Sequence, residues 1–111
     1  MTRVGILKLE SLLQIEQSLS GRVTSVNKVV YRPDGSILTD LDIELDNIVI
    51  QVNTGGGKGL TKQLVNSVNS TGKTAIGYVS DVKPSVLKEA INNGFKGSTN
   101  MDDLIEFISQ N

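Results

Sequence analysis

A short turn between two apolar stretches constrains the fold more than any other feature of the sequence. Ser36 to Leu45 and Ile48 to Asn53 are both predicted to be extended, and Asp46-Asn47 lies between them. This pair suits a two-residue turn whose backbone needs positive φ. The sequence therefore predicts an antiparallel hairpin in which residue 45 faces 48 and residue 42 faces 51.

This register divides the hairpin into an apolar face and a polar face. The predicted core face carries Leu41, Ile43, Leu45, Ile48, Ile50 and Val52. The other face carries Asp40, Asp42, Glu44, Val49, Gln51 and Asn53. Carboxylates at alternate positions of one strand repel one another unless a cation or solvent relieves them. Two explanations are equally open: a bound divalent metal, or the solvated outer face of an edge strand.

The segments before the hairpin predict a helix and a strand. Apolar residues recur at mostly helical spacing over residues 7–20, and Gly21 follows as a stop. Residues 22–31 are rich in Val and Thr, and the turn Arg32-Pro33-Asp34-Gly35 closes this predicted strand. The apolar residues of the predicted amphipathic helix are Leu7, Leu9, Leu12, Leu13, Ile15 and Leu19.

The segments after the hairpin complete a single α/β unit. A helix over residues 59–69 and a buried strand over 74–79 predict a strand, helix, strand crossover with a parallel pair. The rest of the chain predicts a helix that starts at Pro84 and stops at Asn93-Gly94, a short strand opened by Phe95, and a last helix capped by Asn100. At 111 residues, the chain has the length of one domain, residues 1–111.

Composition excludes several kinds of chemistry. Cysteine and histidine are absent, which rules out thiol catalysis, Ser-His triads and the zinc sites that use these ligands. The formal charge of -1 gives no global electrostatic reason for nucleic-acid binding, so phosphates would need a local patch. No apolar run approaches the roughly 18 residues that span a bilayer, so we expect a cytoplasmic protein with no membrane partner.

Two lysine-glycine clusters invite a nucleotide-binding interpretation, but neither is a P-loop, because the first glycine of that motif is missing from both. Residues 70–74 are better explained as a turn between a helix and a strand. In the other cluster, glycines beside lysines at a helix start are also suited to a phosphate that approaches the backbone. The residues of this predicted phosphate-binding loop are Gly55, Gly56, Gly57, Lys58 and Lys62.

The order of these motifs resembles a known nuclease family. Asp42-Ile43-Glu44, Asn47 through Thr54, Lys58 through Gln63, and Gly72-Lys73 before Ala75 through Val79 are similar to the C-terminal nuclease domains of contact-dependent growth inhibition toxins. Those domains belong to the PD-(D/E)XK superfamily, and the resemblance covers roughly residues 39 to 110. It implies a restriction-endonuclease-like mixed sheet flanked by helices, built around this hairpin and the crossover.

The resemblance also implies a Mg²⁺ or Mn²⁺ site on the hairpin. Asp42 matches the first metal-binding Asp of the family, and Glu44 matches the acid two residues further on. Gln51 lies at the position where the family has its second acid. Gln51 is neutral, so the metal would depend on Asp42 and on Asp40 or Glu44. Carboxylate-bound magnesium polarises the scissile phosphate and generates a hydroxide nucleophile.

Further catalytic residues are implied less directly. Asn53 stands where the family often has Lys or Thr, and Lys58 is the expected replacement for that lysine. An upstream helical glutamate often joins such sites, which makes Glu10 and Glu16 candidates. Both are equally well explained as ordinary surface residues of an amphipathic helix.

Three functions follow as expectations. The first is a Mg²⁺-dependent tRNA-cleaving toxin domain, which would work in the cytoplasm of a target cell and be blocked by an immunity protein. The second is a DNA endonuclease or resolvase of the same superfamily. The third is a degenerate nuclease fold that only binds protein or nucleic acid, which the neutral Gln51 and Asn53 favour.

Overall fold

The computed structural model describes residues 3–53, 59–79 and 85–110, and these form a mixed sheet of five strands with four helices. The predicted α/β class is therefore confirmed. The elements are α1 (Arg3–Ser18), β1 (Val23–Tyr31), β2 (Ile37–Leu45), β3 (Ile48–Asn53), α2 (Leu60–Thr71), β4 (Thr74–Val79), α3 (Ser85–Asn92), β5 (Lys96–Ser98) and α4 (Met101–Ser109).

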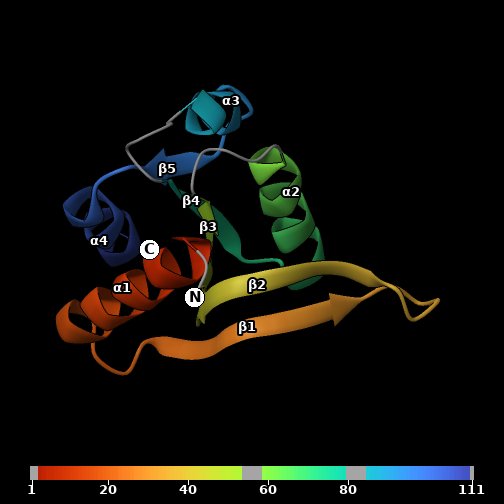
Figure 1. Cartoon of the computed structure of the whole chain (residues 1–111), viewed down its shortest axis with the longest axis horizontal. Coiled ribbons are helices and arrows are strands. Elements are labelled where there is room, and N and C mark those ends of the chain that lie inside the picture. The colour runs from red at the N-terminus through yellow and green to blue at the C-terminus, as the bar shows by residue number, and fades with distance from the viewer. Residues whose placement is uncertain (1–2, 54–58, 80–84, 111) are drawn as a thin grey trace.

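The strands lie in the sheet in the same order as in the chain, from β1 to β5. The first three pair antiparallel, whereas β3 with β4 and β4 with β5 are parallel. Because α2 connects β3 to β4, the predicted strand, helix, strand crossover is present. Figure 1 shows α1 and α4 on one side of the sheet and α2 and α3 on the other.

The local signals of the sequence produce the expected connections. β2 and β3 pair Ile43 with Ile50 and Glu44 with Val49, which is the register set by a turn at residues 46 and 47. In the turn between β1 and β2, Gly35 has a φ of 88°, a conformation that glycine adopts without steric cost. The Asn100 side chain accepts the backbone N–H of Asp102 at 2.8 Å, so the predicted cap of α4 is confirmed.

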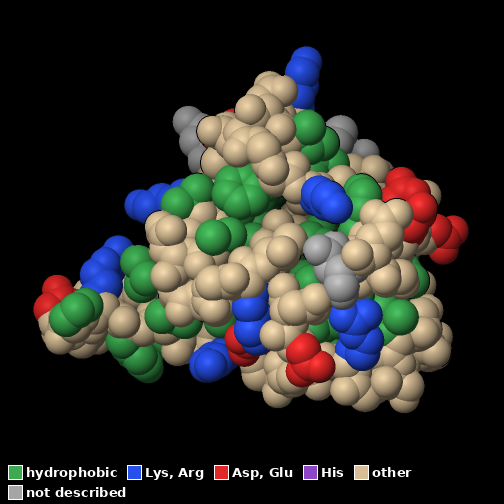
Figure 2. Space-filling model, turned by 180° about the vertical axis from the view of Figure 1, so that it is seen from behind, with side chains coloured by type: hydrophobic (Ala, Val, Ile, Leu, Met, Phe, Trp, Pro, Cys, Tyr) green, Lys and Arg blue, Asp and Glu red, His purple; other side chains and the backbone are tan. Residues whose placement is uncertain are grey.

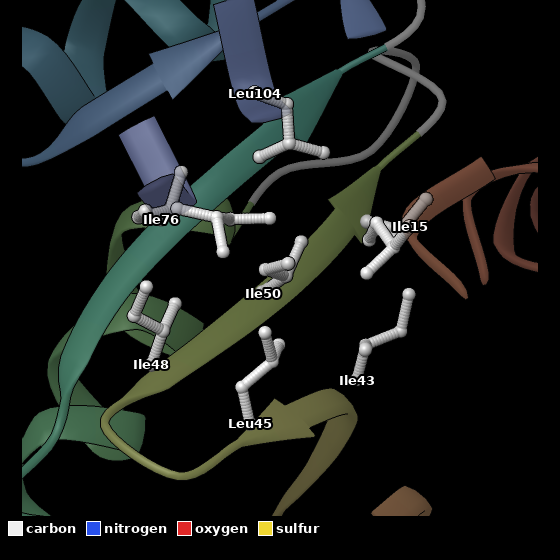
Figure 3. Close-up of a cluster of buried hydrophobic side chains, with 9 residues drawn as sticks. Ile15, Ile43, Leu45, Ile48, Ile50, Ile76 and Leu104 are labelled. Atoms are coloured by element: carbon white, nitrogen blue, oxygen red, sulfur yellow. The ribbon is translucent and has the colours of Figure 1, made fainter. Parts of the chain in front are cut away.

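The apolar face of the hairpin forms the centre of the core, as predicted. Its six residues are 0 to 4% exposed, and α1 and α4 cover most of them through Ile15, Leu104 and Ile108 (Figure 3). A second cluster on the other face of the sheet joins α2 and α3 to β4, with Leu60, Leu64, Ala75, Val79, Leu87 and Ala90 as its buried members. Apolar burial on both faces holds the sheet between its helices.

The structure corrects one expectation about burial and excludes one of the two explanations for the polar face of the hairpin. The helical spacing predicts that Leu9 and Leu13 face the core, but their side chains are 46% and 54% exposed. The buried side of α1 carries Ser11 and Ile15. Leu9 and Leu13 are each two residues from one of these, and residues two apart on a helix point in different directions. The polar face of the hairpin is not the solvated face of an edge strand. β1 covers the free side of β2, so β2 lies inside the sheet.

Among the described helices, none has the length and apolar character that a membrane span requires.

Candidate active site

Two buried polar side chains join β2 to β3 where their backbone pairing stops. The ladder between these strands ends at Ile43 and Ile50, although β3 continues to pair with β4 as far as Asn53. Beyond that pair, Oδ2 of Asp42 accepts the backbone N–H of Val52 at 2.8 Å, and Nε2 of Gln51 donates to the Asp40 carbonyl oxygen at 2.8 Å. Side chains thus replace backbone hydrogen bonds at the carboxyl end of β3.

A lysine from α1 completes this cluster. Nζ of Lys8 lies 2.7 Å from Oδ1 of Asp42 and 3.1 Å from Oδ1 of Asn27 on β1. Asn27 has a φ of 55°, in the left-handed region that asparagine tolerates better than most residues. Backbone conformations of this kind are enriched at functional sites. One helix and two neighbouring strands therefore bring three polar side chains to one point.

Burial dominates the electrostatics of Asp42. The residue is 4% exposed, and desolvation raises the pKa of its carboxyl group above the usual range. The hydrogen bonds from Lys8 and from the backbone of Val52 oppose this rise, and the nearby charge of Asp40 adds to it. A buried carboxylate of this kind is stabilised by a cation, and Lys8 provides one.

Gln51 connects the cluster to α2 and keeps one oxygen without a partner. Its Nε2 also donates to Oγ of Ser67 at 2.8 Å, and Ser67 donates to the Gln63 carbonyl oxygen at 2.7 Å. Both Gln51 and Ser67 are fully buried. Oε1 of Gln51 accepts no hydrogen bond from any described residue. Because buried polar atoms are normally satisfied, this unpaired oxygen is an exception in the cluster.

Glu44, predicted as a metal ligand, is held by three protein groups. Its Oε2 lies 2.8 Å from Nζ of Lys73, and its Oε1 accepts the Ser25 hydroxyl at 2.6 Å and lies 3.9 Å from Nζ of Lys28. The hydrogen bonds from Lys73 and Ser25 lower the pKa of Glu44. Both oxygens of Glu44 have protein partners, as both oxygens of Asp42 do, so the Glu44 contacts stabilise the fold and its role as a metal ligand stays a prediction.

The ion pair of Glu44 predicts a pH-dependent stability. Because the folded-state pKa of Glu44 lies below its unfolded value of about 4.3, the pair stabilises the fold above that pH, and this contribution is lost as the pH falls through the folded pKa. Glu44→Gln is expected to lower the free energy of unfolding at pH 7 by about 1 to 3 kcal/mol, with a smaller difference from wild type at pH 3. Urea unfolding at both pH values measures this.

The control for that experiment is Glu10→Gln, because Glu10 is exposed on α1. We expect this control to change stability by no more than about 0.5 kcal/mol at either pH. A pH-independent loss in Glu44→Gln would contradict the assignment, since it would show that packing and not charge accounts for the effect.

The other predicted site residues differ in their exposure. Asp40 is half-buried and contributes its carbonyl oxygen to Gln51. Glu10, Glu16 and Lys62 are exposed. Gly55, Gly56, Gly57 and Lys58 lie outside the described residues, as does Pro84.

Sequence reasoning missed Lys8 and Asn27. A signal for Lys8 existed, because it lies on the buried side of α1, three residues before Ser11 and seven before Ile15. A charged residue on the buried side of a helix needs an oppositely charged or hydrogen-bonding partner. Asn27 carries no comparable signal, since an isolated polar residue at an exposed position suggests no particular partner.

Two oxygen donors of this cluster are of the kind that magnesium takes, although Lys8 already contacts one of the Asp42 oxygens. Magnesium in enzymes is often held by one or two carboxylates, with water and substrate phosphates as the remaining ligands. Asp42 and the unpartnered Oε1 of Gln51 are oxygen donors of the required kind. In residues 3–53, 59–79 and 85–110, no three Asp, Glu, His or Cys side chains come together as a ready metal cage. The site would therefore depend on substrate to complete the coordination.

Comparisons with known proteins assign no family. No family model matches the sequence, and the searches of curated proteins and of solved structures gave no significant match.

Proposed function

We propose that this protein is a metal-dependent nuclease that hydrolyses phosphodiester bonds, with tRNA as the favoured substrate. The observation that carries the proposal is the buried Asp42 carboxylate, which lies beside Lys8 at the point where β2 and β3 separate. The resemblance to the nuclease domains of contact-dependent growth inhibition toxins identifies the same Asp42 as the first metal-binding acid. A mixed sheet between layers of helices also agrees with that resemblance.

The residues of the cluster suit phosphodiester hydrolysis. In this reaction a water oxygen forms a bond to phosphorus, the bond to a sugar oxygen breaks, and that oxygen takes up a proton. A bound magnesium ion would polarise the phosphate and promote loss of a proton from water. Asp42 and Gln51 would hold the ion, and the N–H of Val52 keeps the Asp42 carboxylate in a fixed position. Because Asp42 is buried, its electrostatic interactions are stronger than they would be in water.

The surface charge favours a specific nucleic-acid partner over nonspecific DNA binding. The formal net charge is -1, and on the face drawn in Figure 2 the lysine and arginine side chains lie in separate groups instead of one continuous stripe. Nonspecific affinity for duplex DNA rests largely on neutralising many phosphates, which such a surface does poorly. If the protein is a toxin domain, an immunity protein that blocks the cluster is its expected protein partner.

A cleavage assay tests the proposal. The purified protein is incubated with total tRNA and with linear duplex DNA, in magnesium or in chelator, and the products are resolved on a denaturing gel. We expect tRNA cleavage that depends on magnesium. Cleavage of duplex DNA in place of tRNA would identify the DNA endonuclease, and cutting that persists in chelator would contradict the metal-dependent mechanism.

One observation favours a second function, that of a binding module. The charge of Asp42 is already balanced by Lys8, and Gln51 adds no negative charge, so the cluster is electrostatically complete without a metal. Calorimetric titration with magnesium separates the two functions. A nuclease should show binding that depends on Asp42, whereas a binding module has no reason to take up the ion.

A further inference from the structure

We propose that Lys8 is the catalytic cation of this site, and that its ammonium group competes with the metal ion for Asp42. The inference rests on the proposed nuclease function and assigns a role to a residue outside the motifs of the resemblance. The nuclease domains that this chain resembles often have a lysine at the position of Asn53. Lys8 would supply its charge from α1 instead.

The geometry of Lys8 carries the proposal. Its ammonium group contacts a buried carboxylate at 2.7 Å, yet its own side chain is 21% exposed. The group therefore lies at the boundary between the buried cluster and solvent, where a substrate phosphate would arrive. A lysine side chain is a compact charge on a flexible stem, so its head can move a short distance while the helix stays in place.

The other lysines near the hairpin are less suitable. Lys73 is engaged with Glu44 and with the carbonyl oxygen of Leu45, both at 2.8 Å. The Lys28 side chain is 58% exposed, and its ammonium group lies 3.9 Å from Glu44. Lys8 is the lysine for which the structure shows contact with Asp42.

The same contact makes metal binding and Lys8 release interdependent. Oδ2 of Asp42 is engaged by the backbone N–H of Val52, and Oδ1 is engaged by Lys8. A metal ion that approaches Oδ1 meets a positive charge already in contact with it. If a metal ion bound there, the Lys8 ammonium group would leave Oδ1 of Asp42 and could stabilise the negative charge that develops on the phosphate.

The test measures magnesium affinity by calorimetry and single-turnover tRNA cleavage at saturating magnesium. Lys8→Gln keeps a hydrogen-bond donor for Asp42 but removes the charge. We expect this variant to bind magnesium about tenfold more tightly, because a competing charge is gone. We expect it to cleave about a hundredfold more slowly, because the phosphate has lost a charged partner. Lys28→Gln is the matched control and should leave both quantities within about twofold of wild type.

The outcomes separate this inference from the proposed function. If wild type binds magnesium and cleaves RNA, but Lys8→Gln changes neither quantity, the role of Lys8 is overturned and the nuclease function stands. Weaker magnesium binding in the variant would also overturn it, since it would show that Lys8 supports the site without competing. If wild type neither binds magnesium nor cleaves, the proposed function fails and the inference fails with it.

A second variant covers the case in which Lys8→Gln does not fold. Lys8→Arg keeps the positive charge and the ion pair with Asp42, but its planar guanidinium group differs in shape from an ammonium group. We expect near wild-type magnesium affinity and about tenfold slower cleavage. Cleavage as slow as that expected for Lys8→Gln, in a Lys8→Arg variant that remains folded, would overturn a role that rests on the positive charge.

Discussion

Asp42→Asn is expected to reduce magnesium-dependent tRNA cleavage about a thousandfold, because the proposed site would lose its carboxylate ligand and the several kcal/mol that a correctly held metal contributes. Asparagine is nearly the same shape as aspartate, and its Oδ1 can still accept the backbone N–H of Val52. The substitution thus removes the charge while it preserves the hydrogen bond that ties β2 to β3.

Stability and activity should separate in this variant. Burial already raises the pKa of Asp42, so a neutral side chain avoids part of the desolvation cost at this position. We therefore expect a free energy of unfolding within about 1 kcal/mol of wild type, measured by urea unfolding. Calorimetry should show that magnesium binding is lost as well.

The matched control is Asp46→Asn, the same substitution at the exposed turn of the same hairpin. Its cleavage rate should stay within about twofold of wild type. If Asp42→Asn and Asp46→Asn cleave equally well, Asp42 is not a metal ligand and the proposed site is wrong.

Ile50→Ala is expected to destabilise the fold by about 3 to 4 kcal/mol, within the range for large-to-small substitutions in a core. Ile50 is fully buried on β3, in the cluster that α1 and α4 cover (Figure 3). Removing three carbon atoms there costs their transfer free energy and leaves a cavity that rigid neighbours cannot fill. A loss of this size is a large fraction of the 5 to 15 kcal/mol that is typical of small domains.

The midpoint of urea unfolding measures the effect, and an unchanged slope shows that the unfolded state is not altered. Ile37→Ala on the adjacent strand is the control, because Ile37 is 60% exposed. We expect this control to cost no more than about 1 kcal/mol, mainly through lower strand preference. Equal losses at the two positions would show that burial does not determine stability here.

The hairpin was predictable because its signals are local. The two-residue turn at Asp46-Asn47 fixes the register, and the pair Ile43–Ile50 confirms that register in the structure. The caps and turns at Gly35 and Asn100 were predictable for the same reason, since each depends on a few neighbouring residues. The apolar face of the hairpin followed from the same alternation.

The composition of the candidate site was only partly predictable. Asp42 and Gln51 follow from the register, but the partners of the acidic residues do not. Lys8 reaches Asp42 because α1 docks across the sheet, and Lys73 reaches Glu44 from the turn before β4. These contacts join segments far apart in the sequence. The repulsion between the acidic residues of β2 correctly indicated that a cation must lie near them. The sequence could not show that lysine side chains of this chain are those cations.

The order of the strands has a consequence for how the chain reaches its native state. Because sheet order follows chain order, each strand can be added beside the one synthesised before it, without a long segment having to close first. The β2–β3 hairpin can form early, and the other strands can join its two sides. The contact between Lys8 and Asp42 requires α1 to pack against β2 and β3, so we expect it to form in the later steps. A partly folded chain can therefore possess much of its sheet while it still lacks the assembled cluster.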